Sequence, residues 1–157
     1  MIYCKPLAST ITRNDGRGDG KFGARRDGGS RFHTGRDFVC IPGEAVFSMI
    51  QGKVVKYERP YTKHPEWSGV QIENHIFRLE MWYMDPRNTV AVGQYVNAGE
   101  MVGVAQDISL KYPPNKDGAM TPHIHVRLTL LPFNAIANDR YISYEQHVDP
   151  AILLIGV

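Results

Sequence analysis

Residues 123–130 read HIHVRLTL, a short strand-like run bounded by polar and turn-forming segments. Five similar runs precede it along the chain, at residues 45–49, 52–57, 69–73, 76–83 and 101–105. No window of eleven residues has a convincing helical period of 3.6. Strands at roughly ten-residue spacing, with few helices, predict an all-β sandwich or barrel.

The run 76–83 alternates in the strand sense, so neighbouring side chains lie on opposite faces. Apolar and aromatic side chains share one face and charged side chains the other: Phe77, Leu79, Met81 and Tyr83 against Arg78 and Glu80. A weak internal repeat, PGEAV at 42–46 and AGEMVG at 98–103, indicates a duplicated β-hairpin architecture.

The composition predicts one soluble domain with a real core. The chain has 157 residues, of which 43% are hydrophobic and 10% aromatic, which excludes a disordered tail protein. The formal charge is only +2, but residues 1–40 carry eight basic and four acidic side chains. This mildly positive region favours an anionic polymer such as cell wall as a partner. Its excess of positive charge is too small to indicate a nucleic-acid-binding surface.

The localisation of the protein is predicted from two features that the sequence lacks, a membrane span and a signal peptide. No segment reaches the ~20 apolar residues that a membrane span needs. The N-terminus, MIYCKPLAST, lacks a basic region followed by a long apolar core, so we do not expect a secretory signal peptide. We therefore expect a virion-associated or non-classically exported protein, with other virion or secretion-machine proteins as partners, rather than a purely cytoplasmic one. A signal removed before residue 1 is the alternative.

Two short motifs are candidates for a metal site. HTGRD places His33 and Asp37 four residues apart around a glycine, and HIH places His123 and His125 on one face of a strand. If the two pieces meet, two imidazoles and a carboxylate converge, and three protein ligands with an open position are typical of catalytic zinc. Each motif also occurs by chance, and buried structural histidines are the alternative.

The two cysteines, Cys4 and Cys40, allow two interpretations. In an exported protein we expect a disulfide, which would close a loop of about 36 residues and stabilise the fold by ~3–4 kcal/mol. In a cytosolic protein we expect two buried free thiols.

The order of these motifs resembles the lysostaphin-type (LytM-like) zinc endopeptidases, which cleave peptide cross-bridges in bacterial peptidoglycan. The likeness runs over residues 20–130 and rests on FGARR, HTGRD, GKVV, VNAGEMVGVA and TPHIHVRL. It implies a single antiparallel β-sheet domain of the duplicated hybrid motif type, with a groove across the sheet. Within this domain it implies a loop-rich part at 1–32, a zinc-site core at 33–130 and a C-terminal extension at 131–157.

The resemblance also implies roles for individual residues. By it, His33, Asp37 and His125 bind zinc, and His123 is the catalytic histidine that assists the attacking water. Zinc is then the expected cofactor, acting as a Lewis acid, and a peptidoglycan peptide is the expected substrate.

One departure from the family concerns its second catalytic histidine. In the matching stretch MWYMDP, residues 81–86, Met84 stands at the place of that histidine. A thioether neither transfers a proton nor donates to an oxyanion. The neighbouring Tyr83 can donate a hydrogen bond, but strand alternation directs it to the opposite face unless the strand bulges there.

Two functions are therefore compatible with the sequence. The first is a zinc-dependent endopeptidase of peptidoglycan, such as a phage tail or virion enzyme that opens the wall. The second is a catalytically degenerate zinc-binding structural or interaction module of the same fold. ITRNDGRGDGKFGARR, YERPY and MWYMDP resemble more closely the leukocyte cell-derived chemotaxin-2-like branch, which binds zinc and is not regarded as a peptidase. That branch also implies the Cys4–Cys40 pairing.

Overall fold

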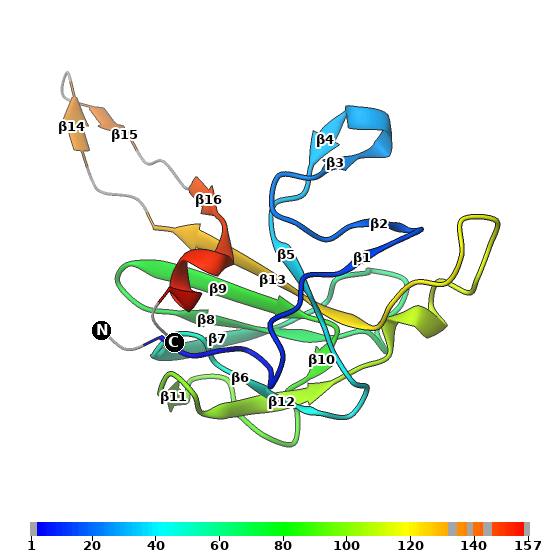
Figure 1. Ribbon diagram of the computed structural model, residues 1–157. Helices are drawn as coiled ribbons and strands as arrows, with labels where there is room; N and C mark the ends of the chain where they lie inside the picture. Colours follow the sequence, from blue (N-terminus) through cyan, green and yellow to red (C-terminus); the bar gives the residue numbers. More distant parts are fainter. Residues whose placement is uncertain (1–2, 132–134, 138–139, 143–145, 156–157) are drawn as a thin grey trace.

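The computed structural model describes residues 3–131, 135–137, 140–142 and 146–155. Its largest unit is an antiparallel sheet of seven strands: β5 (Arg36–Val39), β7 (Gly52–Glu58), β8 (Gly69–Glu73), β9 (Phe77–Trp82), β11 (Tyr95–Val96), β13 (His123–Leu130) and β16 (Gln146–Val148). The strands pair in the order β11-β7-β8-β9-β13-β16, and β5 also pairs with β13. β13 thus pairs with β5 along His123–Val126 and with β9 along His125–Leu130 (Figure 1).

A smaller sheet lies against one face of the large one, below it in Figure 1. Its strands are β6 (Ala45–Phe47), β10 (Met84–Asp85) and β12 (Met101–Ala105), in the order β10-β12-β6. The remaining elements are short hairpins and 3₁₀ helices: β1 (Asn14–Asp15), β2 (Gly18–Asp19), β3 (Arg25–Arg26), β4 (Arg31–Phe32), β14 (Ala135–Ala137), β15 (Arg140–Ile142), η1 (Asp27–Gly29), η2 (Ile108–Leu110) and η3 (Pro150–Leu154). No helix among the described residues is long and apolar enough to cross a membrane.

The prediction of an all-β chain built from antiparallel strands is confirmed. The runs 69–73, 101–105 and 123–130 coincide with β8, β12 and β13. The runs 45–49 and 52–57 differ from β6 and β7 only at their C-terminal ends.

The apolar core lies between the two sheets. A single cluster of buried side chains unites Leu79 and Ile124 of the large sheet with Val46 and Val102 of the small one, and all four are 0% exposed. Strand alternation explains what remains on the other face of β13. Ile124 and its i+2 neighbours enter the core, so the two histidines of β13 face away from it.

The chain changes sheets at Tyr83, between β9 and β10. Tyr83 has a positive φ of 65°, which non-glycine residues rarely adopt. The amides of Tyr83 and Met84 both donate to the Ser68 carbonyl oxygen, at 2.9 and 3.3 Å, so two residues oppose one as in a β-bulge. The predicted strand 76–83 therefore ends at Trp82, and the alternation predicted for Tyr83 is wrong.

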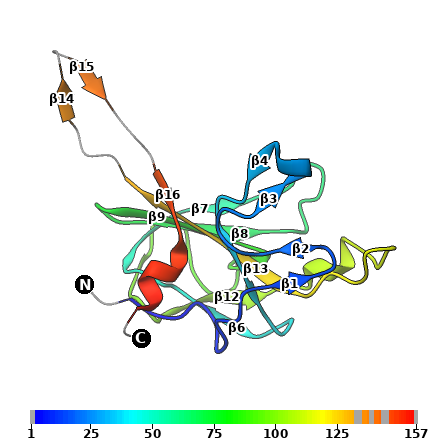
Figure 2. The same ribbon diagram turned by 45° about the horizontal axis from the view of Figure 1, so that its top comes forward.

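The N-terminal segment, residues 11–32, lies on the face of the large sheet that carries His123 and His125 (Figure 2), and hydrogen bonds join it to β5. Backbone hydrogen bonds link Arg13 N–H to the Asp37 carbonyl, Asp37 N–H to the Gly20 carbonyl, and Gly20 N–H to the Arg13 carbonyl, at 2.7–2.9 Å. Gly20 has no room for a side chain, because a Cβ there would lie 2.8 Å from Asp37 Cβ. The glycine-rich segment thereby carries its arginines to the same face as the β13 histidines.

Both cysteines are free thiols in the structure, and their pairing in an exported protein stays a prediction. Cys4 is half-buried and Cys40 is buried. Burial, with a smaller effect of Glu44 and Asp107, raises the pKa of the Cys40 thiol to about 12. The thiol of Cys40 is therefore protonated and unreactive near neutral pH.

Candidate metal centre

The pairing of β5 with β13 brings the two sequence motifs together. Asp37 and His125 are direct partners in the register of these antiparallel strands. His33 lies just before β5, and its amide donates to the Ala24 carbonyl at 2.8 Å. The sequence predicts a meeting of these three residues, and the structure places all three together in the interior.

Three potential ligand atoms converge on one point. His125 Nδ1 is 2.9 Å and His33 Nε2 is 3.2 Å from Asp37 Oδ1, and the two ring nitrogens are 3.0 Å apart. Zinc bound tetrahedrally at 2.0–2.1 Å would hold such atoms ~3.3 Å apart. A carboxylate and two imidazole nitrogens are also the donor types that zinc prefers. The residues present therefore fit a zinc ion in both spacing and chemistry.

Hydrogen bonds to neighbouring residues orient these candidate ligands. His33 Nδ1 lies 2.9 Å from the Lys21 carbonyl oxygen, so it carries the proton and leaves the Nε2 lone pair for a metal. Asp37 Oδ2 accepts from Nε and Nη2 of Arg13, at 3.2 and 3.1 Å, which leaves Oδ1 available. The arrangement presents one oxygen of Asp37, and not both, to the point of convergence.

The protonation states also suit metal binding. Burial opposes ionisation of Asp37, but its close contacts with the His125 and His33 rings and the nearby His123 hold the pKa of its carboxyl well below the usual value. Burial lowers the pKa of His125, although Asp37 opposes that shift. An ionised Asp37 carboxylate beside a neutral His125 imidazole is the state that binds a metal cation.

Gly35, between His33 and Asp37, is a residue whose role the sequence analysis did not assign. A Cβ at Gly35 would lie 2.4 Å from the Val126 carbonyl oxygen and 2.6 Å from two atoms of the His125 ring. Only glycine lets the turn before β5 approach the imidazole this closely. The glycine in HTGRD is the signal that could have identified it.

We expect Gly35→Ala to weaken zinc binding at least ~tenfold, because the added methyl displaces the His125 ring, and disturbing ligand orientation costs ~10–100-fold in affinity. Competition for zinc against a chromophoric chelator measures the change. Thr34→Ala alters the neighbouring, exposed residue and serves as the matched control. Equal affinity for wild type and Gly35→Ala would show that the close packing does not matter for the metal.

His123 lies next to the three converging residues without joining them. Its Nδ1 is 2.8 Å from the Thr121 carbonyl oxygen, so the proton resides on Nδ1 and the Nε2 lone pair is free to accept. Nε2 is 3.8 Å from Asp37 Oδ2. Burial lowers the pKa of His123, although Asp37 opposes the shift, so the ring is neutral at pH 7. It is a candidate general base beside the metal site.

Tyr83 reaches the same site because of the bulge. Its ring meets that of His123 edge-on, with centroids 5.5 Å apart. Its hydroxyl is 3.0 Å from the hydroxyl of Tyr61, which is in turn 2.8 Å from that of Tyr112. Burial raises the pKa of Tyr83 to about 12, so its hydroxyl stays protonated and can donate.

The side chain of Met84 points away from the site and into the apolar core, so the prediction that it occupies the histidine place in the groove is wrong. Its side chain is 0% exposed and belongs to the apolar core. Its terminal methyl packs so closely on Gly103 that a Cβ there would lie 2.4 Å away. The residue that faces the site from this stretch is Tyr83.

We therefore expect Met84→His to lower the free energy of unfolding by about 3 kcal/mol, because an imidazole would be buried without a partner in the core. The substitution should not raise any hydrolytic rate. Chemical denaturation of zinc-loaded protein measures the first effect, with Met84→Leu as the volume-matched control. A stable, faster Met84→His variant would contradict this placement.

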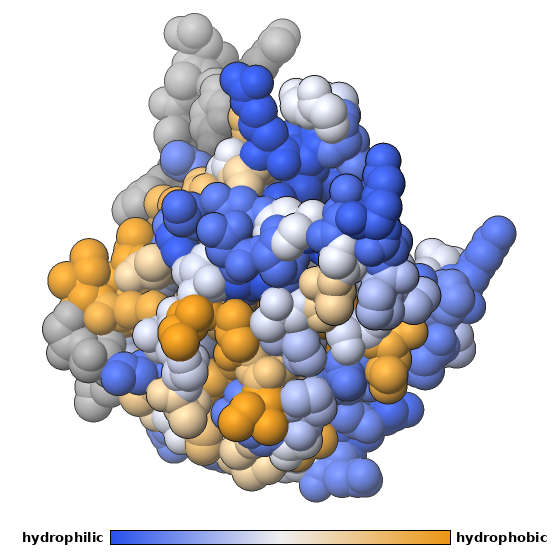
Figure 3. Space-filling model, turned by 45° about the vertical axis from the view of Figure 1, so that its right-hand side comes forward, coloured by the Kyte–Doolittle hydropathy of each residue, from blue (hydrophilic) through white to orange (hydrophobic). Residues whose placement is uncertain are grey.

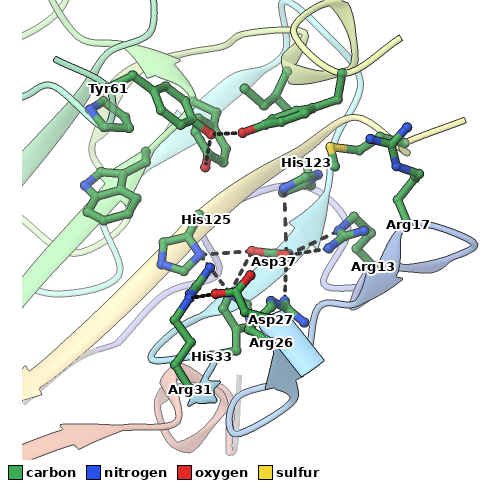
Figure 4. Close-up of a pocket in the computed structure, with 16 residues that line it drawn as sticks. Arg13, Arg17, Arg26, Asp27, Arg31, His33, Asp37, Tyr61, His123 and His125 are labelled. Carbon is green, nitrogen blue, oxygen red and sulfur yellow. Dashed lines mark hydrogen bonds and ion pairs between the residues drawn. The ribbon is translucent and has the colours of Figure 1, made fainter. Parts of the chain in front are cut away.

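The candidate residues line one cavity of about 460 Å³. In Figure 4, Tyr61 lies on one side of His123 and His125, and Asp37 lies on the other side with Arg13 and Arg26 next to it. Tyr83, Tyr112 and His33 line the same cavity. On the surface, hydrophilic residues gather over the upper part of the face in Figure 3, where the N-terminal hairpins lie.

Comparison with known proteins adds similarity in sequence and in fold. No family model matches the chain. It is 29% identical to leukocyte cell-derived chemotaxin-2 of Bos taurus over 127 residues, which are 80% of this chain and 78% of the relative. The mouse (Mus musculus) protein of the same name is 27% identical over 126 residues.

Solved peptidase structures share the fold. The solution structure of lysostaphin matches with a TM-score of 0.51 and 21% identity over 78% of this chain. A zinc-containing peptidase from Vibrio cholerae matches with a TM-score of 0.56 and 20% identity over 91% of the chain. The chain spans 46% of lysostaphin and 39% of the Vibrio cholerae protein. The resemblance predicted from the motifs is confirmed.

Proposed function

We propose that this chain, which has the fold of the lysostaphin-type peptidases, is a zinc-dependent endopeptidase that cleaves peptide cross-bridges of bacterial peptidoglycan. The observation that carries the proposal is the convergence of His33, Asp37 and His125 beside a cavity that His123 also lines. Among the matching structures, lysostaphin is described as an antimicrobial peptidase and the Vibrio cholerae protein as a zinc-containing peptidase, which supports the assignment.

The mechanism assigns a separate task to each residue. His33, Asp37 and His125 would hold the zinc ion, which supplies Lewis-acid activation of water and of the peptide carbonyl when bound. His123 Nε2 accepts the proton of the attacking water and delivers it to the leaving amine. The Tyr83 hydroxyl donates a hydrogen bond to the oxygen that becomes negative as the carbonyl carbon turns tetrahedral.

The metal assignment is tested directly by stoichiometry. After dialysis against micromolar zinc, the wild type should hold about one zinc per chain, and His125→Ala should hold close to none because only two ligands remain. Chelation should also lower the melting temperature, since the metal binds the native state alone. His75→Ala, at an exposed turn, is the matched control. Full zinc occupancy in His125→Ala would exclude this ligand set.

A second candidate function is a zinc-stabilised binding module. The observation that favours it is the similarity to leukocyte cell-derived chemotaxin-2, together with the lack of a histidine in MWYMDP, residues 81–86. The two candidates are separated by the zinc-dependent release of new amino groups from purified cell walls of several chemotypes. Release that a chelator abolishes supports the peptidase; zinc binding without any release supports the module. A role in a phage tail or virion stays a prediction from the sequence.

A further inference from the structure

The arginine wall of the cavity, which we define as Arg13, Arg17, Arg26 and Arg31, is unused by the proposed mechanism. Asp27 and Asp37 are the only acidic residues among those that line the cavity. Four arginines and two aspartates leave the lining with a surplus of two positive charges. A bound divalent cation would increase this surplus.

Arg13 and Arg26, the two inner arginines of the wall, already have partners within the protein. Arg13 is 4% exposed, and it pairs with Asp15 at 2.8 Å and with Asp37 at 3.1 Å. Arg26 donates to the Asp19 carbonyl oxygen at 2.7 Å and lies 3.7 Å from Asp37. Burial lowers the pKa of Arg26; Asp37 opposes this, while Arg13 and Arg31 add to it. Asp15 and Asp37 thus offset the charges of these two arginines, and the positive charge that remains for a ligand belongs to Arg17 and Arg31.

Arg17, one of the two outer arginines, is held in place. Its Nη1 donates to the Pro113 carbonyl oxygen at 3.0 Å. The turn that carries it packs tightly on the segment 113–121, because a Cβ on Gly16 would lie 1.7 Å from the Asp117 carbonyl oxygen. The Thr121 amide also donates to Asp15 at 2.8 Å. Arg17 needs little further ordering to bind a ligand, and its remaining guanidinium N–H groups make no hydrogen bond to the residues that the structure describes.

Arg31, the other outer arginine, pairs with Asp27 at the opposite rim. Both side chains are about 60% exposed, at 62% and 60%, so this pair is solvated and weak. A ligand anion can therefore compete with Asp27 for the Arg31 guanidinium. Figure 4 shows Arg17 and Arg31 on two sides of Asp37 and His123, so both border the position of a bound peptide.

We propose, on the basis of the proposed function, that the cavity selects peptides that carry a carboxylate near the scissile bond, and that Arg17 at one rim and Arg31 at the other each offer a guanidinium group to such a carboxylate. Guanidinium groups form paired hydrogen bonds with carboxylates, which gives recognition as well as attraction. The charge lies inside a bounded cavity next to the metal ligands, which favours a peptide group over an extended polyanion. The carboxylate is a side chain or a chain terminus.

The test uses zinc-loaded protein and three short probes that differ in charge alone. Acetyl-Gly-Gly-Glu-Gly-amide carries a side-chain carboxylate, its Gln analogue carries none, and the Gln analogue with a free C-terminus carries a terminal one. Calorimetry in the cold gives each Kd, and mass spectrometry confirms that the probes stay intact. We expect a carboxylate probe to bind about tenfold more tightly than the neutral one at low salt, and the advantage to shrink at high salt.

Variants assign the effect to the wall. Arg17→Gln and Arg31→Gln should each reduce the advantage of the carboxylate probe, and the double variant should remove it without weakening binding of the neutral probe. Arg25→Gln, an exposed arginine that does not line the cavity, is the matched control and should bind like the wild type. The terminal-carboxylate probe tells which source of the carboxylate the site prefers.

Three outcomes would overturn the inference. The first is equal binding of charged and neutral probes, and the second is an advantage that survives in the double variant Arg17→Gln/Arg31→Gln. The third is competition by inorganic phosphate without any preference among the peptides, which would indicate a general anion site. Zinc stoichiometry and wall hydrolysis, measured on the same protein, report separately on the proposed function.

Discussion

His123→Ala is expected to lower the rate of wall hydrolysis ~100–10,000-fold while zinc stays bound, as is typical for removal of a general base. The Thr121 carbonyl fixes the proton on Nδ1 and leaves Nε2 to accept one, and burial keeps the ring neutral. His123 shares a strand face with His125, so a water activated at the metal would lie within its reach. No other neutral imidazole among the described residues lines the cavity outside the ligand set.

The measurement is the release of amino groups from purified walls, with zinc content determined on the same samples. His75→Ala, which alters an exposed histidine between β8 and β9, should behave as the wild type. A His123→Ala variant with full zinc and undiminished rate would remove His123 from the mechanism. Loss of zinc together with activity would instead make His123 a support of the metal site.

Tyr83→Phe is expected to lower the same rate ~100–1,000-fold, the usual effect of deleting one donor to a developing oxyanion. The phenyl ring keeps the edge-on contact with His123, so the site geometry is preserved while the hydroxyl is lost. The raised pKa of about 12 means that the wild-type hydroxyl donates throughout the accessible pH range. Binding of uncleaved peptide should change little, because the oxyanion exists only in the transition state.

Separate determination of kcat and KM tests this role, since a donor to the transition state affects kcat and leaves KM nearly constant. Tyr95→Phe removes a hydroxyl from an exposed tyrosine on β11 and is the control for the chemistry of the substitution. An unchanged kcat in Tyr83→Phe would leave the metal as the sole stabiliser of the oxyanion.

The strands could be predicted from sequence because they follow from short-range rules, whereas the candidate ligand set came from the resemblance to a known family. Short apolar runs bounded by turn signals predict β8, β12 and β13, and strand alternation puts His123 and His125 on one face. The positions of Tyr83 and Met84 could not be predicted in the same way. A single positive φ at Tyr83 exchanges the directions of the two side chains, and propensity gives no warning of such a φ at a tyrosine.

The arginine wall was beyond prediction for a different reason. Its placement depends on contacts of the glycine-rich segment with residues 113–121, about 100 positions along the chain, such as the bond from Arg17 to Pro113 with a separation of 96. The sequence gives the excess of positive charge in residues 1–40 but not the face that receives it. Gly16 and Gly35 were equally beyond prediction, since each permits a close approach to a residue that lies far away in sequence.

The segment between Asn14 and Phe32 contains one buried residue, Gly20, and so adds almost no apolar side chain to the core. Its attachment is polar, through Arg13, the backbone bonds to β5 and the contacts with 113–121. Such a segment can open without unfolding the sheets, so its amide hydrogens exchange with solvent far sooner than those of β13. A metal ion that joins His33 to His125 would tie the end of this segment to β13 and slow that exchange. Protection of these amides therefore reports metal occupancy even in a protein that hydrolyses nothing.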